Sequence, residues 1–145
     1  MNVLLDTCAL SEIRHPRGNP AVREAVLKFR DQELFISVIT LGELAKGIAL
    51  LDPGERQQEL NAWLAGLEQH YADRILDITS DIVRVWGELT AAAQRNGRVV
   101  PASDGLIAAT ALHHGLRVMT RNVDDFAPTG VRILNPWMPP GVHEA

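Results

Sequence analysis

Acidic residues recur in this chain where an apolar run ends or a helix pattern begins. They are Asp6, Glu43, Asp104, Asp124 and Asp125. Carboxylates gathered in one place repel one another strongly unless a cation neutralises them. A set of oxygen ligands, without Cys or His at ligand spacing, selects Mg²⁺ or Mn²⁺ rather than zinc. If the fold brings these side chains together, the sequence predicts an acidic pocket for a divalent metal ion.

Each acid also has an ordinary structural interpretation. Glu43 follows Thr40 at the spacing of a capping box, and Asp104 in a first helical turn would compensate the helix dipole. The adjacent acids at 124–125 could shape a turn. Asp6 is harder to explain in this way, because a carboxylate at the end of an apolar strand must be hydrogen-bonded or metal-bound. The prediction therefore rests on the whole set of acids.

The elements that must position these acids alternate along the chain. Apolar runs predict strands over residues 2–5, 34–37, 74–78, 116–120 and 131–134. Helical patterns cover residues 9–14, 20–30, 40–51, 55–70 and 80–96, and a further one lies within 101–115. Residues 121–126 and 135–145 are expected to be a loop and an irregular tail.

The stretch 101–115 is predicted to be the central helix. The hydroxyl of Ser103 could cap its start, and Gly115 stands where a left-handed cap ends a helix. Asp104 lies in its first turn. At helical spacing, the residues expected to face inward are Ile107, Ala108, Ala111 and Leu112.

Continuous apolar strands that alternate with helices indicate a parallel sheet covered on both faces. We therefore expect an α/β fold with three αβα layers and a mostly parallel sheet of about five strands. Ligands of such sheets bind beyond the carboxyl ends of the strands. All the acids named above should face that end of the sheet.

Composition limits the possible partners and setting. A length of 145 residues with 46% hydrophobic residues predicts one compact domain over residues 1–145. A net charge of −4 gives no overall basic surface, so a nucleic acid must be held by a local patch or through metal ions. Cys8 is the only cysteine, which fits a reducing compartment, and no apolar run is long enough to span a membrane. We expect a cytoplasmic protein.

Four motifs in this order resemble the PIN-domain ribonucleases, and more narrowly the VapC and FitB type toxins of bacterial type II toxin–antitoxin pairs. They are Leu4-Leu-Asp-Thr7, Ser37-x-x-Thr40-x-x-Glu43-Leu, Pro101-Ala-Ser-Asp104-x-x-Ile-Ala-Ala109 and Thr120-Arg-Asn-x-x-Asp-Phe126. The tail Asn135-Pro-Trp137 also matches FitB-like members. The resemblance implies a PIN-like fold and an Mg²⁺- or Mn²⁺-dependent endoribonuclease that cuts RNA such as tRNA or ribosomal RNA. It also implies a homodimer, inhibited by a VapB/FitA-like antitoxin that alone contacts operator DNA.

The resemblance assigns metal ligands residue by residue. Asp6 and Asp104 match the core ligands, and Glu43 matches the third acid. Some members place the fourth acid at the position of Asn122 and others at that of Asp125. We favour Asp125 as the fourth catalytic acid and metal ligand, with Asn122 as a neutral helper.

Further residues are expected around these ligands. Thr7, Ser103 and Thr120 could orient carboxylates as hydroxyl donors. Cys8 stands where many members carry Asn, which leaves one contact beside the metal site open. Candidates to hold flanking phosphates are Arg14, Arg17, Lys46, Arg98 and, best placed beside the acidic loop, Arg121.

Two other functions compete with an active toxin. The first is a toxin-family protein that acts mainly in an antitoxin complex on operator DNA, with weak nuclease activity. The second, less favoured, is a receiver-type phosphoacceptor domain, which needs an aspartate closing its third strand and a nearby lysine. The third strand offers only Asp77, followed by Ile78, and no lysine lies beyond Lys46.

Overall fold

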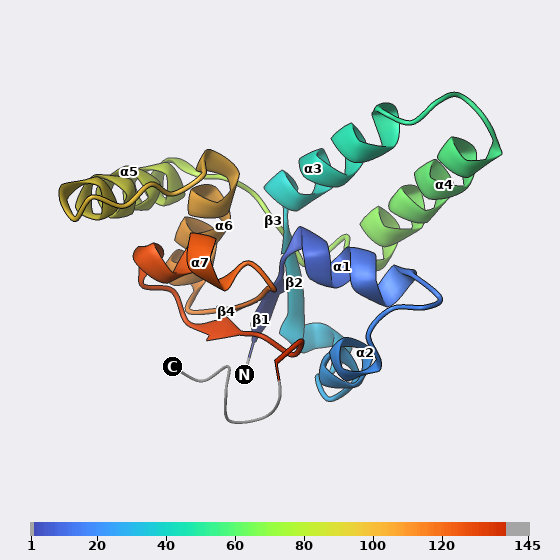
Figure 1. Ribbon diagram of the computed structural model, residues 1–145, viewed down its shortest axis with the longest axis horizontal. Coiled ribbons are helices and arrows are strands. Elements are labelled where there is room, and N and C mark those ends of the chain that lie inside the picture. The colour runs from blue at the N-terminus through green and yellow to red at the C-terminus, as the bar shows by residue number, and fades with distance from the viewer. Residues whose placement is uncertain (1, 139–145) are drawn as a thin grey trace.

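The computed structural model describes residues 2–138 and contains a five-stranded parallel sheet between two layers of helices (Figure 1). The strand order is β3-β2-β1-β4-β5, so β1 is central and its neighbours are β2 and β4. The strands are β1 (Val3–Leu5), β2 (Leu34–Ser37), β3 (Ile75–Leu76), β4 (Arg117–Met119) and β5 (Ile133–Leu134). The predicted α/β fold with three layers is confirmed.

Seven α-helices occur among the described residues. They are α1 (Thr7–Arg14), α2 (Pro20–Leu27), α3 (Val38–Ala49), α4 (Glu55–His70), α5 (Ser80–Arg95), α6 (Ala102–His114) and α7 (Val123–Phe126). Helices α1 to α4 lie on one side of the sheet, while α6 and α7 lie on the other with α5 packed outside α6 (Figure 1). The carboxyl ends of β1, β2 and β4 therefore open between two helical layers.

Alternation along β1 builds the core on both faces of the sheet. Val3 and Leu5 join a cluster with α1, α3 and α4, whereas Leu4 joins a cluster with α6 and α7. All three side chains are fully buried, as expected when successive side chains of a central strand point to opposite covered faces. The chain emerges from this dry core directly at Asp6.

Helix α6 differs from its prediction at its start and at one residue expected to face inward. It begins at Ala102 after Pro101, and no side chain caps it, so Ser103 is not a cap. Gly115 does end it with a φ of 68°, as predicted. Leu112 was expected to face the core but is 40% exposed, whereas the adjacent Ala111 is fully buried.

The segment 121–126 is another difference from the sequence-based expectation. Its second half forms α7 instead of a loop, followed by a 3₁₀ turn over Ala127–Thr129. The carbonyl of Asn122 accepts the amides of Asp125 and Phe126, and the Phe126 ring is fully buried. Burial of this ring fixes a helical turn whose neighbouring residues are polar.

No helix within residues 2–138 combines the length and apolar character needed to cross a bilayer. The irregular tail predicted over 135–145 is described only as far as Met138, and its remainder lies outside the described residues.

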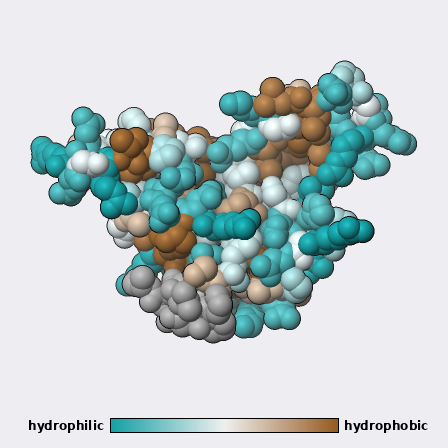
Figure 2. All heavy atoms as spheres, in the orientation of Figure 1, coloured by the Kyte–Doolittle hydropathy of each residue, from teal (hydrophilic) through white to brown (hydrophobic). Residues whose placement is uncertain are grey.

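Apolar surface gathers over α3 and α4 (Figure 2), where Leu50 and Leu51 are exposed at the end of α3.

Candidate active site

Two acids of the candidate site, which we call the inner acids, are buried at element ends. Asp6 directly follows β1, precedes α1, and is 2% exposed. Its backbone N–H donates to the carbonyl of Met119 at 3.0 Å, which joins the end of β1 to the end of β4. Asp104 lies in the first turn of α6 and is 9% exposed. Both positions follow from the topology, because a parallel sheet brings its strand ends to one edge.

Two further acids, the outer acids, reach the same place from the margins. Glu43 lies in the second turn of α3, is partly exposed, and accepts a hydrogen bond of 2.7 Å from the Thr7 hydroxyl. Asp125 is exposed on α7 and is close enough to Asp104 to raise the pKa of that buried carboxyl. The fold therefore brings all four predicted acids into one neighbourhood.

Glu43 is not a helix cap. The cap residue of α3 is Ser37, whose hydroxyl accepts from the amide of Ile39 at 3.0 Å. Glu43 was expected at the beginning of this helix but lies six residues after its cap residue, Ser37. The hydroxyl of Thr40 is buried without a hydrogen-bond partner in the described chain, so the capping box between Thr40 and Glu43 does not form.

The electrostatics of the inner acids reflect burial beside like charges. Burial, the largest cause, and neighbouring carboxylates together raise the pKa of Asp104 to about 7. In decreasing order of effect, those carboxylates are Asp6, Asp125 and Glu43. Burial also raises the pKa of Asp6, while hydrogen bonds, the one from Thr120 foremost, act against that rise. At neutral pH the site holds negative charge that the inner acids bear at an energetic cost.

No described basic side chain relieves this charge by an ion pair. The ion pairs found in residues 2–138 lie elsewhere and join Arg30 to Glu33, His70 to Asp31 and Arg74 to Asp73. The donor set is all oxygen, which fits Mg²⁺ or Mn²⁺ by charge and chemistry. Within the same range, however, no three His, Cys, Asp or Glu side chains stand in an arrangement that would hold a metal ion as placed.

Hydroxyl and thiol groups hold the Asp6 carboxylate. Thr120 Oγ1 donates to Asp6 Oδ2 at 2.8 Å, and Asn122 donates its backbone N–H to Thr120 Oγ1 at 2.9 Å. Cys8 Sγ donates to the same Asp6 oxygen at 3.5 Å. Cys8, which stands where many family members carry Asn, therefore contacts the Asp6 carboxylate through its sulfur. The sequence analysis predicted no partner for this side chain.

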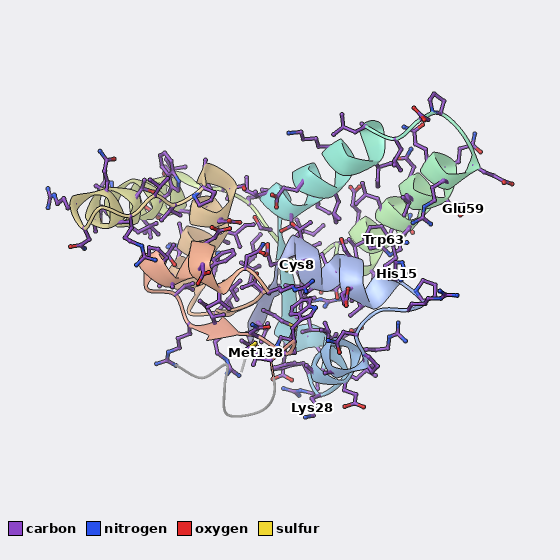
Figure 3. All side chains as sticks on the ribbon, viewed as in Figure 1. Cys8, His15, Lys28, Glu59, Trp63 and Met138 are labelled. Atoms are coloured by element: carbon purple, nitrogen blue, oxygen red, sulfur yellow. The ribbon has the colours of Figure 1, made fainter. Side chains whose placement is uncertain are left out.

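Of the predicted phosphate-binding residues, Arg14 is partly buried against another side chain and the other four are exposed. Arg14 lies over the Trp63 ring, 5.7 Å from its centroid, and Trp63 faces α1 from α4 (Figure 3). Arg14 also lines a cavity of about 300 Å³ whose wall includes Thr7 and Glu43. The exposed candidates are Arg17, Lys46, Arg98 and Arg121, of which Arg121 directly follows Thr120.

Among the remaining candidates, Ser103 is partly buried one residue before Asp104, and Asn122 is exposed before α7. Asp124 is exposed beside Asp125. Asp125 is among the carboxylates that raise the pKa of Asp104. Of the three positions considered for the fourth acid, Asp125 is the one that this effect identifies as a neighbour of Asp104.

Comparison with known proteins places this arrangement in a family. The PIN domain family profile matches residues 3–130. The VapC ribonuclease Y4jK of Sinorhizobium fredii is 35% identical over 94% of this chain and 99% of its own length. Toxin FitB of Neisseria gonorrhoeae is 33% identical over 93% of this chain and 98% of its own.

A solved structure of FitAB bound to an IR36 DNA fragment superposes with a TM-score of 0.89. It shares 30% sequence identity and covers 94% of this chain and 96% of the solved chain. The family profile spans strands β1 to β4 and both inner acids. Because the match is to the PIN domain family, the receiver-type interpretation is excluded. The chain belongs to the PIN domain family, and its relatives lie among the VapC and FitB proteins.

Proposed function

We propose that this chain is a divalent-metal-dependent endoribonuclease that acts as the toxin of a type II toxin–antitoxin pair. Its similarity to a VapC ribonuclease and to toxin FitB supports a ribonuclease toxin. The observation that carries the metal-dependent chemistry is the meeting of Asp6 and Asp104, both buried, with Glu43 and Asp125. No basic side chain in residues 2–138 forms an ion pair with these buried carboxylates, so a bound metal cation would compensate their charge.

Asp6 and Asp104 would be the core ligands of Mg²⁺ or Mn²⁺, with Glu43 and Asp125 completing the set. When bound, such an ion polarises a phosphate and lowers the pKa of a coordinated water. Asp104 must lose its proton before it can bind the ion. Affinity should therefore rise with pH through the pKa of Asp104, about 7.

The remaining residues prepare the hydrolysis of an RNA phosphodiester. Glu43 or Asp125 would orient the attacking water and accept its proton. Thr7 and Thr120 hold the carboxylates of Glu43 and Asp6 through bonds of 2.7 and 2.8 Å. The water oxygen would attack phosphorus in line with the 3′ oxygen, and the bond between phosphorus and the 3′ oxygen would break. The products would be a 3′ hydroxyl, which takes up a proton, and a 5′-phosphate.

Positioning of the substrate falls to residues at the margin of the site. Arg121 is exposed directly after Thr120 and would contact a flanking phosphate. Ser103 and Asn122 would assist as neutral hydrogen-bonding groups. We propose tRNA or ribosomal RNA as the target, in line with the resemblance to VapC and FitB toxins.

The partners we propose are a second copy of the chain and a VapB/FitA-like antitoxin. The likeness to FitAB bound to DNA supports an antitoxin complex on operator DNA. With a net charge of −4, this chain has no overall basic surface for DNA, so the antitoxin would make the DNA contacts. A cytoplasmic location fits its single cysteine.

A second candidate function is favoured by the same DNA-bound relative. In it the chain acts mainly in the antitoxin complex on operator DNA, and its nuclease activity is weak. Both functions keep the same four acids, so activity must be measured to separate them.

The test is incubation of purified protein with total RNA and Mn²⁺, followed by mapping of new 5′ ends. We expect discrete cuts bearing 5′-phosphates, which excess chelator abolishes, and growth arrest on expression that Asp6→Asn relieves. Cutting that persists in chelator would contradict the metal mechanism. No cutting of any RNA by the intact protein would favour the complex-only function.

A further inference from the structure

The Cys8 thiol lies between two parts of the candidate site that are far apart in sequence. It is the second residue of α1 and is partly buried in the centre of the molecule (Figure 3). Sγ donates to Asp6 Oδ2 at 3.5 Å and accepts the backbone N–H of Arg121 at 3.3 Å. It also lies 3.5 Å from Thr120 Oγ1. One sulfur therefore contacts the end of β1 and the segment that follows β4.

Thr120 makes a parallel connection to a different amide. Its hydroxyl donates to the same Asp6 oxygen at 2.8 Å and accepts the amide of Asn122 at 2.9 Å. The amide of Arg121, which lies between Thr120 and Asn122 in sequence, is bound by Cys8 instead. Thr120 and Cys8 together fix two successive amides at the start of the segment 121–126, which carries Asp125.

We propose that Cys8 is a positioning residue, whose thiol links the Asp6 carboxylate to the backbone of segment 121–126. Two donors on one oxygen restrict rotation of the Asp6 carboxylate. The bond from Arg121 sets where the chain turns toward α7 and hence where Asp125 stands relative to Asp6. The inference rests on the proposed function, because the two acids thus related are proposed metal ligands.

The alternative is that Cys8 only fills space, since a free cysteine often behaves as a small apolar side chain. A filler would be replaced by alanine with a small loss of stability and no change in metal affinity. A link through hydrogen bonds would be lost in Cys8→Ala and largely kept in Cys8→Ser, because the hydroxyl also donates and accepts. Ser11→Ala, one turn further along α1, is the matched control.

The experiment measures Mn²⁺ affinity by calorimetry and the exchange rate of the Arg121 amide by NMR without metal. For Cys8→Ala we expect affinity about 10-fold weaker and exchange about 10-fold faster. Cys8→Ser should stay within about threefold of the parent protein in both readouts, and Ser11→Ala should match it. Circular dichroism checks that each variant is folded.

Parent-like affinity and exchange in Cys8→Ala would overturn the proposal, as would a Cys8→Ser variant as impaired as Cys8→Ala. If the parent protein itself binds no Mn²⁺, the proposed function fails instead. The Arg121 exchange rate then still decides whether the thiol makes the link, because that readout needs no metal. Should Cys8→Ala prove unfolded, Cys8→Ser alone decides, with exchange unlike the parent's counting against the link.

Discussion

The inner and outer acids of the site differ in burial and in the elements that carry them. Asp6 and Asp104 are 2% and 9% exposed and lie at the end of β1 and the start of α6. Glu43 and Asp125 are more exposed and lie on α3 and α7. The inner acids therefore bear the cost of burial, and the outer acids supply adjustable groups.

This difference leads us to expect separate roles in binding and turnover. A buried carboxylate with a raised pKa destabilises the protein at neutral pH unless a ligand compensates. An exposed carboxylate costs little and can move a proton or a water. We therefore expect the inner acids to control metal binding and the outer acids to control the rate of cleavage.

The largest effect is expected from neutralising an inner acid. Asp6→Asn or Asp104→Asn should lower RNA cleavage about 100- to 1,000-fold, the scale seen when one preorganised electrostatic group is removed. Glu43→Gln should lower Mn²⁺ affinity less than the inner-acid substitutions do, and it should also cleave more slowly. Rates on a defined RNA together with Mn²⁺ calorimetry separate the two classes. Equal loss of metal affinity in all these variants would remove the distinction between inner and outer acids.

Packing around α6 provides the next test. A Cβ on Gly105 would come within 3.0 Å of the Trp86 ring on α5, and the two helices are in extensive contact. Gly105→Ala should therefore cost about 1–3 kcal/mol of unfolding free energy and shift the neighbouring Asp104. Denaturant unfolding and Mn²⁺ affinity measure the two consequences.

Gly87→Ala on α5 is the control for this substitution, since its Cβ meets nothing within 4 Å. It should stabilise the helix by about 0.5–1 kcal/mol, as alanine does in place of glycine inside a helix. If both variants were equally stable, close packing against Trp86 would not position the inner acid.

Stability should depend on pH through Asp104. The ordinary pKa of an aspartic acid is 3.8, and that of Asp104 in the folded protein is about 7. Between these values the folded chain keeps a proton that the unfolded chain has lost, so stability falls as pH rises through this window. Without metal, the melting temperature should fall by roughly 3–6 °C more in the parent than in Asp104→Asn. Parallel pH profiles for the two proteins would show that Asp104 does not titrate in this window.

The smallest effect is expected from Thr7→Val, which removes only the hydrogen bond to Glu43. A neutral donor of this kind contributes about 1 kcal/mol, so cleavage should slow about fivefold, with a smaller loss of Mn²⁺ affinity than any of the inner-acid substitutions causes. A loss of affinity as large as that of Asp6→Asn would show that Glu43 controls binding as strongly as the inner acids do.

The positions of the inner acids could be predicted because they depend on topology. Asp6 ends an apolar strand and Asp104 opens a helix bounded by Gly115, and parallel strands bring such ends together. The segment 121–126 could not be predicted as helical, because burial of Phe126 against α6 residues fixes that turn. The contacts of Cys8 were equally hidden, since they join residues 112 and 113 positions apart.

Helix α6 shows why its buried face was assigned only in part. Its residues Asp104, Gly105 and Ile107–Ala111 are all buried, because the sheet covers one side and α5 the other. A helix covered on two sides has no single apolar stripe from which to read its orientation. Leu112 has the helical spacing of an inward-facing residue, yet its side chain is 40% exposed.

The most direct test is anomalous diffraction at the manganese edge from crystals grown with Mn²⁺. We expect a peak bound by oxygens of both Asp6 and Asp104, at about 2.1 Å from each. Absence of a peak between the inner acids at saturating Mn²⁺ would contradict a metal-binding role for this cluster.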